Sequence, residues 1–251
     1  MKRIHFVTLA ALLLFSLQAF AQVDVKDIVR KAEEKRRGLE SSQAEITMTI
    51  VRPEWTRTMS LKSWSKGDDY AMMLVTAPAR DQGTATLKRD KEVWNWMPTI
   101  ERTIKLPPSM MSQSWMGSDF TNNDLVQEVS VIDDYDHKIL KDSTIQGRAC
   151  WKIQMIPHEG VAVVWGKVHA FIDKKDYLML RSEYFDEDGF MVNILQASGI
   201  KDISGRTFAT KLEMIPVEEK GHKTVLEYHS IVFDKEIPET FFSVQNMKRL
   251  K

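Results

Sequence analysis

The chain has 251 residues, of which 43% are hydrophobic and 28% are charged, and this composition excludes a largely disordered chain and a polytopic membrane protein. Lys plus Arg and Asp plus Glu both number 35, so no excess of positive charge indicates nucleic-acid binding. The single cysteine excludes a disulfide within the chain. This length allows one large domain or two modest ones.

The start of the chain has the three parts of a secretory signal peptide. Two basic residues at positions 2 and 3 precede an apolar run over 6–20, which ends in Ala-Phe-Ala. The run is shorter than the roughly 20 residues that span a bilayer. Gln22, rather than a cysteine that could carry lipid, follows it. We therefore expect residues 1–21 to be cleaved and 22–251 to form one soluble, non-lipidated periplasmic domain.

Residues 24–39 are typical of a helix. The aspartate at the first position can cap the helix, and Gly38 can end it. Ile28, Val29 and Ala32 form a narrow apolar stripe, and the remaining positions are densely charged. Such a charged surface is typical of a helix face exposed to solvent.

After this helix the apolar residues alternate with polar ones, which indicates β-strands. Ala44, Ile46, Met48 and Ile50 show the pattern first. Further strands are expected around 59–61, 70–75, 84–87, 93–97, 99–104, 149–156, 167–172, 178–185, 191–200, 207–215 and 225–233. About a dozen strands joined by short turns exclude a doubly wound α/β fold. They predict a mainly β (α+β) domain with one strongly curved antiparallel sheet or a barrel.

One segment interrupts this succession of strands. Pro107 and Pro108 end the strand before it, and the residues from Leu106 to Leu125 then carry almost no charge before Asp119. Long loops in compact domains are usually functional or disordered. This loop contains too many large apolar side chains to be disordered in water, so we expect it to be ordered.

The sequence contains no recognisable catalytic or metal-binding motif. His158-Glu159 has no second histidine at the spacing of a zinc protease, and no Gly-x-Ser-x-Gly motif is present. Cys150 lies in an alternating apolar run, which is typical of a buried strand thiol rather than a nucleophile. We therefore expect neither an enzyme nor a metal or cofactor.

The segment that does stand out is rich in methionine and aromatic residues. These side chains pack a core under a curved sheet or contact an apolar ligand of variable shape, and the pattern leaves both interpretations open. The candidate ligand or lid contacts are Trp94, Trp96, Met97, Met110, Met111, Trp115, Met116 and Phe120.

Three motifs resemble one known family. They are Trp94-x-Trp96-x-Pro98, Arg102-x-x-Lys105-x-Pro107, and the run over 114–125 that reads Ser-Trp-Met-Gly-Ser-Asp-Phe-Thr-Asn-x-Asp-Leu. Together they resemble the outer-membrane lipoprotein-sorting protein family, a branch similar to the periplasmic lipoprotein carriers LolA and LolB. The likeness extends from the strand at 44–47 to the segment 237–242.

The resemblance implies an unclosed antiparallel β-barrel with an N-terminal helix, a helical or loop lid, and an apolar cavity that receives lipid chains. It also implies a periplasmic carrier whose partners are lipid or lipoprotein acyl chains. Family members often accompany inner-membrane transporters of the resistance-nodulation-division type, and an outer-membrane acceptor is the other expected partner. A sensor or interaction module on the same fold, acting through protein contacts, remains the alternative function.

Overall fold

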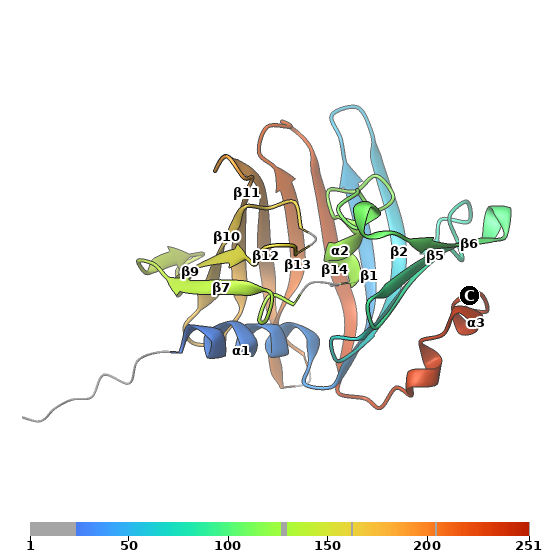
Figure 1. Ribbon diagram of the computed structural model, residues 1–251, viewed down its shortest axis with the longest axis horizontal. Helices are drawn as coiled ribbons and strands as arrows, with labels where there is room; N and C mark the ends of the chain where they lie inside the picture. The colour runs from blue at the N-terminus through green and yellow to red at the C-terminus, as the bar shows by residue number, and fades with distance from the viewer. Residues whose placement is uncertain (1–23, 127–129, 162, 204, 251) are drawn as a thin grey trace, which may run out of the picture.

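A computed structural model of the protein describes residues 24–126, 130–161, 163–203 and 205–250, and the expected signal peptide over 1–21 lies outside these ranges. In the described residues fourteen antiparallel strands form one sheet, which curves strongly without closing (Figure 1). An N-terminal helix accompanies it. This confirms the expected mainly β fold with an unclosed, curved barrel. Among the described residues, no helix is both long and apolar enough to cross a membrane.

The strand order along the sheet is β6-β5-β4-β3-β2-β1-β14-β13-β12-β11-β10-β9-β7, with β8 paired to β9. The first half contains β1 (Ser41–Val51), β2 (Thr56–Lys66), β3 (Tyr70–Ala77), β4 (Ala85–Arg89), β5 (Glu92–Met97) and β6 (Arg102–Leu106). The second half contains β7 (Tyr135–Ile139), β8 (Ser143–Ile145), β9 (Arg148–Pro157), β10 (Lys167–Asp173), β11 (Met179–Phe185), β12 (Met191–Ile203), β13 (Arg206–Pro216) and β14 (Lys223–Phe233).

Helix α1 (Val25–Arg37) confirms the expected N-terminal helix. The Asp24 side chain caps it by accepting a hydrogen bond from the backbone N–H of Lys26 at 2.9 Å. Gly38 ends it with φ of 86°, and a Cβ at that position would lie 2.6 Å from the carbonyl oxygen of Ser41. The apolar stripe of α1 is buried against β7, β9 and β10. The helix therefore lies across one end of the concave face of the sheet (Figure 1).

Strand β1 shows how the alternating sequence pattern builds the core. Ala44, Ile46, Met48 and Ile50 are all buried, as the period of two predicts. β1 pairs with β2 on one side and with β14 on the other, so the first and last strands meet in the middle of the sheet. Cys150 is also buried, on β9, which confirms the expected strand thiol.

The sequence prediction differs from the structure at two places. The strand expected over 99–104 is instead a 3-10 turn (Pro98–Ile100) followed by β6, because Pro98 starts the turn and Glu101 adopts a left-handed conformation with φ of 51°. Strands β7 and β8 were not predicted. Both are short and mainly polar, and both lie at one edge of the sheet, where burial imposes little hydrophobic pattern.

The two ends of the strand order are consecutive in the sequence. β6 is one edge and β7 is at the other, so residues 107–134 connect the two sides of the open barrel. This crossing segment contains a 3-10 turn (Pro108–Met110) and helix α2 (Asn122–Val126). Figure 1 shows α2 in front of the concave face. The apolar loop predicted from the sequence thus covers part of the open side.

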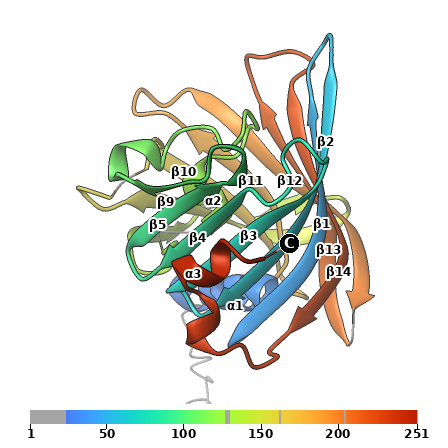
Figure 2. The same cartoon turned by 90° about the vertical axis from the view of Figure 1, so that its right-hand side faces the viewer.

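The C-terminal segment covers part of the outer face. A 3-10 turn (Glu239–Phe241) and helix α3 (Val244–Met247) pack against β3, β4 and β5 (Figure 2). Phe242 and Met247 are fully buried there, beside Trp94 and Trp96. The outer face of β3, β4 and β5 is therefore partly covered by the chain itself.

A candidate ligand-binding cavity

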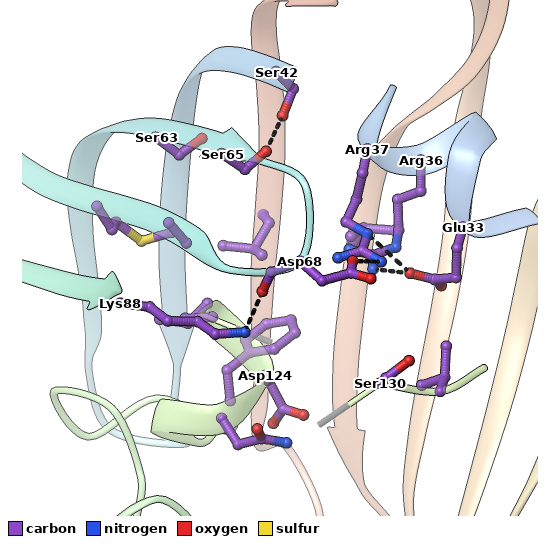
Figure 3. Close-up of a pocket in the computed structure, with 18 of the residues that line it drawn as sticks. Glu33, Arg36, Arg37, Ser42, Ser63, Ser65, Asp68, Lys88, Asp124 and Ser130 are labelled. Atoms are coloured by element: carbon purple, nitrogen blue, oxygen red, sulfur yellow. Dashed lines mark hydrogen bonds and ion pairs between the residues drawn. The ribbon is translucent and has the colours of Figure 1, made fainter. Parts of the chain in front are cut away.

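The concave side of the sheet encloses a cavity of about 490 Å³. This volume is within the range of about 300–1,000 Å³ that is typical of small-molecule sites. Residues from α1, from most of the strands and from the crossing segment line it. Figure 3 shows its polar side chains converging on one region from α1, the β2–β3 turn, β4 and α2.

Most of the cavity wall is apolar, because the inward-facing positions of successive strands meet there. The wall contains many aliphatic and methionine side chains, and methionine in particular adapts to flexible apolar ligands. These residues are Ala44, Ile46, Leu61, Met73, Met155, Val168, Met179, Leu195, Leu212, Met214, Leu226 and Ile231.

Four tyrosines also line the cavity, and three of them, Tyr135, Tyr184 and Tyr228, are well buried. Burial raises the pKa of each phenol above its ordinary value, so all three remain neutral near pH 7. The ring of Tyr184 packs against Trp165, with 4.8 Å between the ring centroids. These phenols add large apolar surface without adding charge.

One end of the cavity is charged. On the last turns of α1, the buried carboxylate of Glu33 forms ion pairs with Arg36 and Arg37. Burial alone would raise the pKa of Glu33, but the two guanidinium groups outweigh it and hold that pKa below its ordinary value. The Nη2 of Arg37 also lies 2.6 Å from the Oδ1 of Asp68 on the β2–β3 turn. This ion pair joins α1 to the opposite rim of the cavity.

A third cation, Lys88, lies deeper in the wall. Lys88 projects inward from β4 and is only 3% exposed. Its Nζ donates a hydrogen bond to the carbonyl oxygen of Asp68 at 2.5 Å (Figure 3). A buried ammonium is costly in an apolar wall, so its position indicates a polar end that the fold maintains.

The crossing segment supplies the remaining part of the cavity lining, which includes Phe120, Asn123, Asp124 and Leu125. The Oδ2 of Asp124 accepts hydrogen bonds from the backbone N–H and the hydroxyl of Thr121, both at 2.8 Å. Burial raises the pKa of Asp124, and these bonds only partly offset the rise. The first turn of α2 is thereby fixed against the cavity.

The central motif of the sequence packs beside this lining. Trp115 is 2% exposed, and its Nε1 donates a hydrogen bond to the Thr86 hydroxyl at 3.1 Å. Phe120 belongs to the same buried cluster, and the partly buried Met116 packs against it. Of the eight residues proposed from the sequence, Phe120 is the one that the cavity lining includes.

The other proposed residues lie in two further places. Met110 and Met111 pack with Val93 and Leu106 near the edge strand β6. Trp94 and Trp96 contact the C-terminal segment on the outer face, and Met97 is partly buried at the end of β5. The structure therefore brings seven of the eight residues into three clusters rather than one, and Met97 lies in none of the three. A ligand-contacting role for them stays a prediction.

Sequence reasoning missed most of the cavity lining. Leu195, Leu212 and Leu226 come from β12, β13 and β14, which looked like ordinary core strands. Their alternation indicated which residues share one face of the sheet. It did not indicate that part of this face remains unfilled, which depends on the curvature of the whole sheet.

Polar groups of the motif fasten it to the sheet. Asp119 accepts hydrogen bonds from both terminal nitrogens of Arg52, at 3.0 and 3.1 Å, and from the Thr224 hydroxyl at 2.6 Å. Arg52 also donates to the carbonyl oxygen of Gly117 at 3.0 Å. The run from Trp115 to Phe120 therefore anchors the crossing segment to β14 and to the β1–β2 turn.

Within the described ranges, no group of three or more His, Cys, Asp or Glu side chains is arranged to hold a metal ion. The histidines also lie apart: His169 is near Glu183 on β11, and His229 is near Thr47 on β1.

Several solved structures have a fold similar to that of this protein. No curated protein matches the sequence. An outer membrane lipoprotein-sorting protein domain from Vibrio parahaemolyticus has a TM-score of 0.79 and 23% identity, over 89% of this chain and 98% of that chain. A LolA superfamily protein from Nitrosomonas europaea has a TM-score of 0.77 and 20% identity, over 89% and 99%. A DUF1329 family protein from Desulfovibrio piger has a TM-score of 0.80 and 23% identity, over 88% and 97%.

These likenesses show that the fold is that of the LolA superfamily. A family model described as uncharacterised-protein-like matches residues 67–249, which is more than half of the chain. The chain therefore belongs to the family that this model describes, and it shares its fold with the three solved structures.

Proposed function

We propose that this protein is a non-enzymatic periplasmic carrier that binds lipid, or the acyl chains of lipoproteins, in the concave cavity and moves them toward the outer membrane. The observation that carries the proposal is the cavity itself, in which many aliphatic, methionine and aromatic side chains line the inside of an unclosed barrel. The signal-peptide pattern over 1–21 supports export of a soluble, non-lipidated domain over 22–251.

The energetics of acyl-chain burial fit this role. Each buried CH₂ is worth roughly 0.8 kcal/mol, so an acyl chain of about 16 carbons costs on the order of 12 kcal/mol to expose to water. A carrier needs a dry surface that recovers most of this energy, and it must still release the chain to a better acceptor. We propose an inner-membrane transporter of the resistance-nodulation-division type as donor or an outer-membrane protein as acceptor.

Two elements are placed to act as a lid. The last turns of α1 line one side of the cavity, and Phe120, at the end of the loop over 110–120, lines another. We propose that one or both move aside when cargo enters. Trp94, Trp96 and Met97 contribute to the ligand surface only if the C-terminal segment that covers the two tryptophans is displaced.

Native mass spectrometry of protein purified without detergent, followed by lipid extraction, tests the proposal. We expect a lipid or acyl adduct on the wild type. Leu195→Trp should fill the cavity and reduce the adduct. Ile194→Trp should leave it intact, because residue 194 points to the other face of the same strand.

Two results would contradict the proposal, one for the carrier function and one for the location of the lipid in this cavity. Wild-type protein that carries no adduct and fails to take up added lipid would favour the sensor or interaction module. An adduct equally abundant in Leu195→Trp and in the wild type would place the lipid outside this cavity. Circular dichroism spectra of both variants would first establish that each is folded.

A further inference from the structure

Three phenol groups of the cavity wall have no hydrogen-bond partner in the described part of the chain. They are the hydroxyls of Tyr135, Tyr184 and Tyr228. Tyr70, the fourth tyrosine of the lining, differs from them, because its hydroxyl donates a hydrogen bond to the Oε2 of Glu239 at 3.2 Å. Buried phenols usually have a partner. Three that lack one in the same cavity therefore indicate donors that a ligand can use.

Ser182 adds a fourth hydroxyl of the same kind. It lines the cavity and is only 1% exposed, and its side chain makes no hydrogen bond to any other described residue. Ser182 lies two residues before Tyr184 on β11, so both side chains lie on the same face of the sheet. The cavity therefore contains a group of hydroxyls in a wall that is otherwise largely apolar.

The register of the sheet places the two phenols of β11 and β14 on its inward face. Tyr184 is opposite Val168 on β10, and Tyr228 is opposite Ile46 on β1, and both partners are buried in the core. The four hydroxyl oxygens are not among the fully enclosed side-chain atoms that lack a hydrogen bond in the described ranges. Each oxygen therefore keeps some accessible surface, and the cavity is the space that this surface faces.

The electrostatic surroundings favour an uncharged acceptor for these donors. Burial is the main cause of the raised pKa of Tyr135 and Tyr184, and the nearby carboxylate of Asp124 raises both further. The phenols therefore remain protonated near pH 7 and can donate hydrogen bonds. A negative charge on Asp124 opposes a second anion beside the same two phenols. A neutral oxygen meets no such repulsion.

The chemistry of amphiphiles narrows the choice of this neutral oxygen. Tyr184 and Tyr228 pack with the aliphatic side chains of Leu195 and Leu212 against the same core cluster, so the acceptor must lie close to a hydrocarbon chain. The carbonyl oxygen that links an acyl chain to its head, in an ester or an amide, has this position and can accept two hydrogen bonds. A plain hydrocarbon would displace water from the hydroxyls and leave them unpaired, which weakens binding.

We propose that the three phenols and Ser182 form a hydroxyl site inside the cavity, which binds the neutral carbonyl oxygen of an ester-linked or amide-linked acyl chain. This inference rests on the proposed carrier function. It adds the chemical group by which the cavity recognises an acyl chain and distinguishes it from other apolar chains.

Calorimetric titration of delipidated protein with three matched, uncharged amphiphiles tests the proposal. The probes are the ester monododecanoylglycerol, its amide analogue dodecanoyl-aminopropanediol and the ether dodecylglycerol, each below the concentration at which it aggregates. All three have the same chain length and a similar head, but the ether lacks the carbonyl. We expect the ester and the amide to bind about threefold to tenfold more tightly than the ether, as neutral hydrogen bonds allow.

Substitutions then locate the acceptor. Tyr135→Phe, Tyr184→Phe and Tyr228→Phe each remove one hydroxyl and keep the ring, so they should reduce the preference for the ester while the ether binds at least as well as before. Tyr177→Phe is the matched control, because its ring packs against Trp151 outside the cavity lining and the preference should not change. Since the three hydroxyls have no partner in the described chain, their removal should not lower the melting temperature of the ligand-free protein.

The other outcomes separate the site from the carrier function. Equal affinity of the wild type for the ester and the ether would overturn the carbonyl site and leave the carrier standing. An unchanged preference in all three phenylalanine variants, or a clear loss of their thermal stability without ligand, would show that the phenols serve the fold rather than a ligand. Failure of all three amphiphiles to bind would contradict the carrier function itself.

The same titrations distinguish the two sources of a carbonyl. Tighter binding of the amide than of the ester would support the site and identify amide-linked chains, such as those of an N-acylated protein. Tighter binding of the ester would support the site and identify ester-linked lipid.

Discussion

Two elements cover the concave side of this barrel, and the chain holds them in different ways. The motif in the crossing segment is anchored by the buried Trp115 and by the ion pair of Asp119 with Arg52, both largely shielded from water. Helix α1 is held by a narrow apolar stripe, and many of its ion pairs are exposed, such as those of Asp27 with Arg30 and Lys31. The contrast indicates that detaching α1 from the sheet requires less free energy than detaching the motif.

The largest effect is expected from Trp115→Ala. Removing this buried ring leaves a cavity and takes away one of the two hydrogen bonds of the Thr86 hydroxyl, which should lower the free energy of unfolding by about 3–5 kcal/mol. Urea denaturation measures the change. A loss similar to that from truncating an exposed tryptophan, such as Trp55→Ala, would contradict the anchoring role.

Asp119→Asn should have the next largest effect. It keeps the size of the side chain but removes the charge that pairs with Arg52, and it should cost about 2–3 kcal/mol because that guanidinium is mostly buried. Asp142→Asn, which breaks the exposed pair with Lys174, is the matched control and should leave the denaturation midpoint nearly unchanged. Equal effects of the two variants would show that the motif is no better anchored than the surface.

The pH dependence of α1 is expected to be smaller. Because the folded pKa of Glu33 lies below its ordinary value of 4.5, its contribution to stability is complete above that value and is lost as the pH falls through the lowered pKa. Glu33→Gln should therefore be less stable than the wild type at pH 7, and the difference should shrink below about pH 4.5. Thermal unfolding of both proteins between pH 3 and pH 7 measures it, and a gap independent of pH would contradict the assignment.

The smallest effect is expected at the exposed end of the same helix. Asp27→Asn breaks ion pairs that solvent already screens, so the melting temperature should stay within experimental error. Differential scanning calorimetry provides the comparison with Glu33→Gln. A clear loss of stability would mean that α1 is held more firmly than its contacts indicate.

The sequence predicted the elements better than the site. The N-terminal helix and most strands follow from local patterns such as the Asp24 cap and the alternation over Ala44 to Ile50, which need no knowledge of distant residues. The cavity depends on which inward faces meet and which remain unfilled. Lys88 illustrates the limit, because in sequence it is an ordinary lysine before a turn and only the fold buries it.

The motif was recognised for its unusual composition, and the structure supplies a reason for that composition. Trp115 and Phe120 fill the core beneath the crossing segment, and Asp119 anchors that segment to two strands. A sequence motif can therefore be distinctive because it holds the crossing segment over the concave face, even when few of its own side chains line the cavity. Phe120 and Leu125 combine both roles, because each packs with the core cluster and also lines the cavity.

The pairing of β1 with β14 has a consequence for how the chain reaches its native state. These strands are the first and the last to be synthesised, yet they are neighbours in the centre of the sheet. Contacts so distant in sequence form slowly, and until β14 arrives one edge of β1 remains unpaired. The nascent protein therefore presents a long, partly apolar strand edge that can pair with other chains. Chaperone protection should matter most before the final strand is in place.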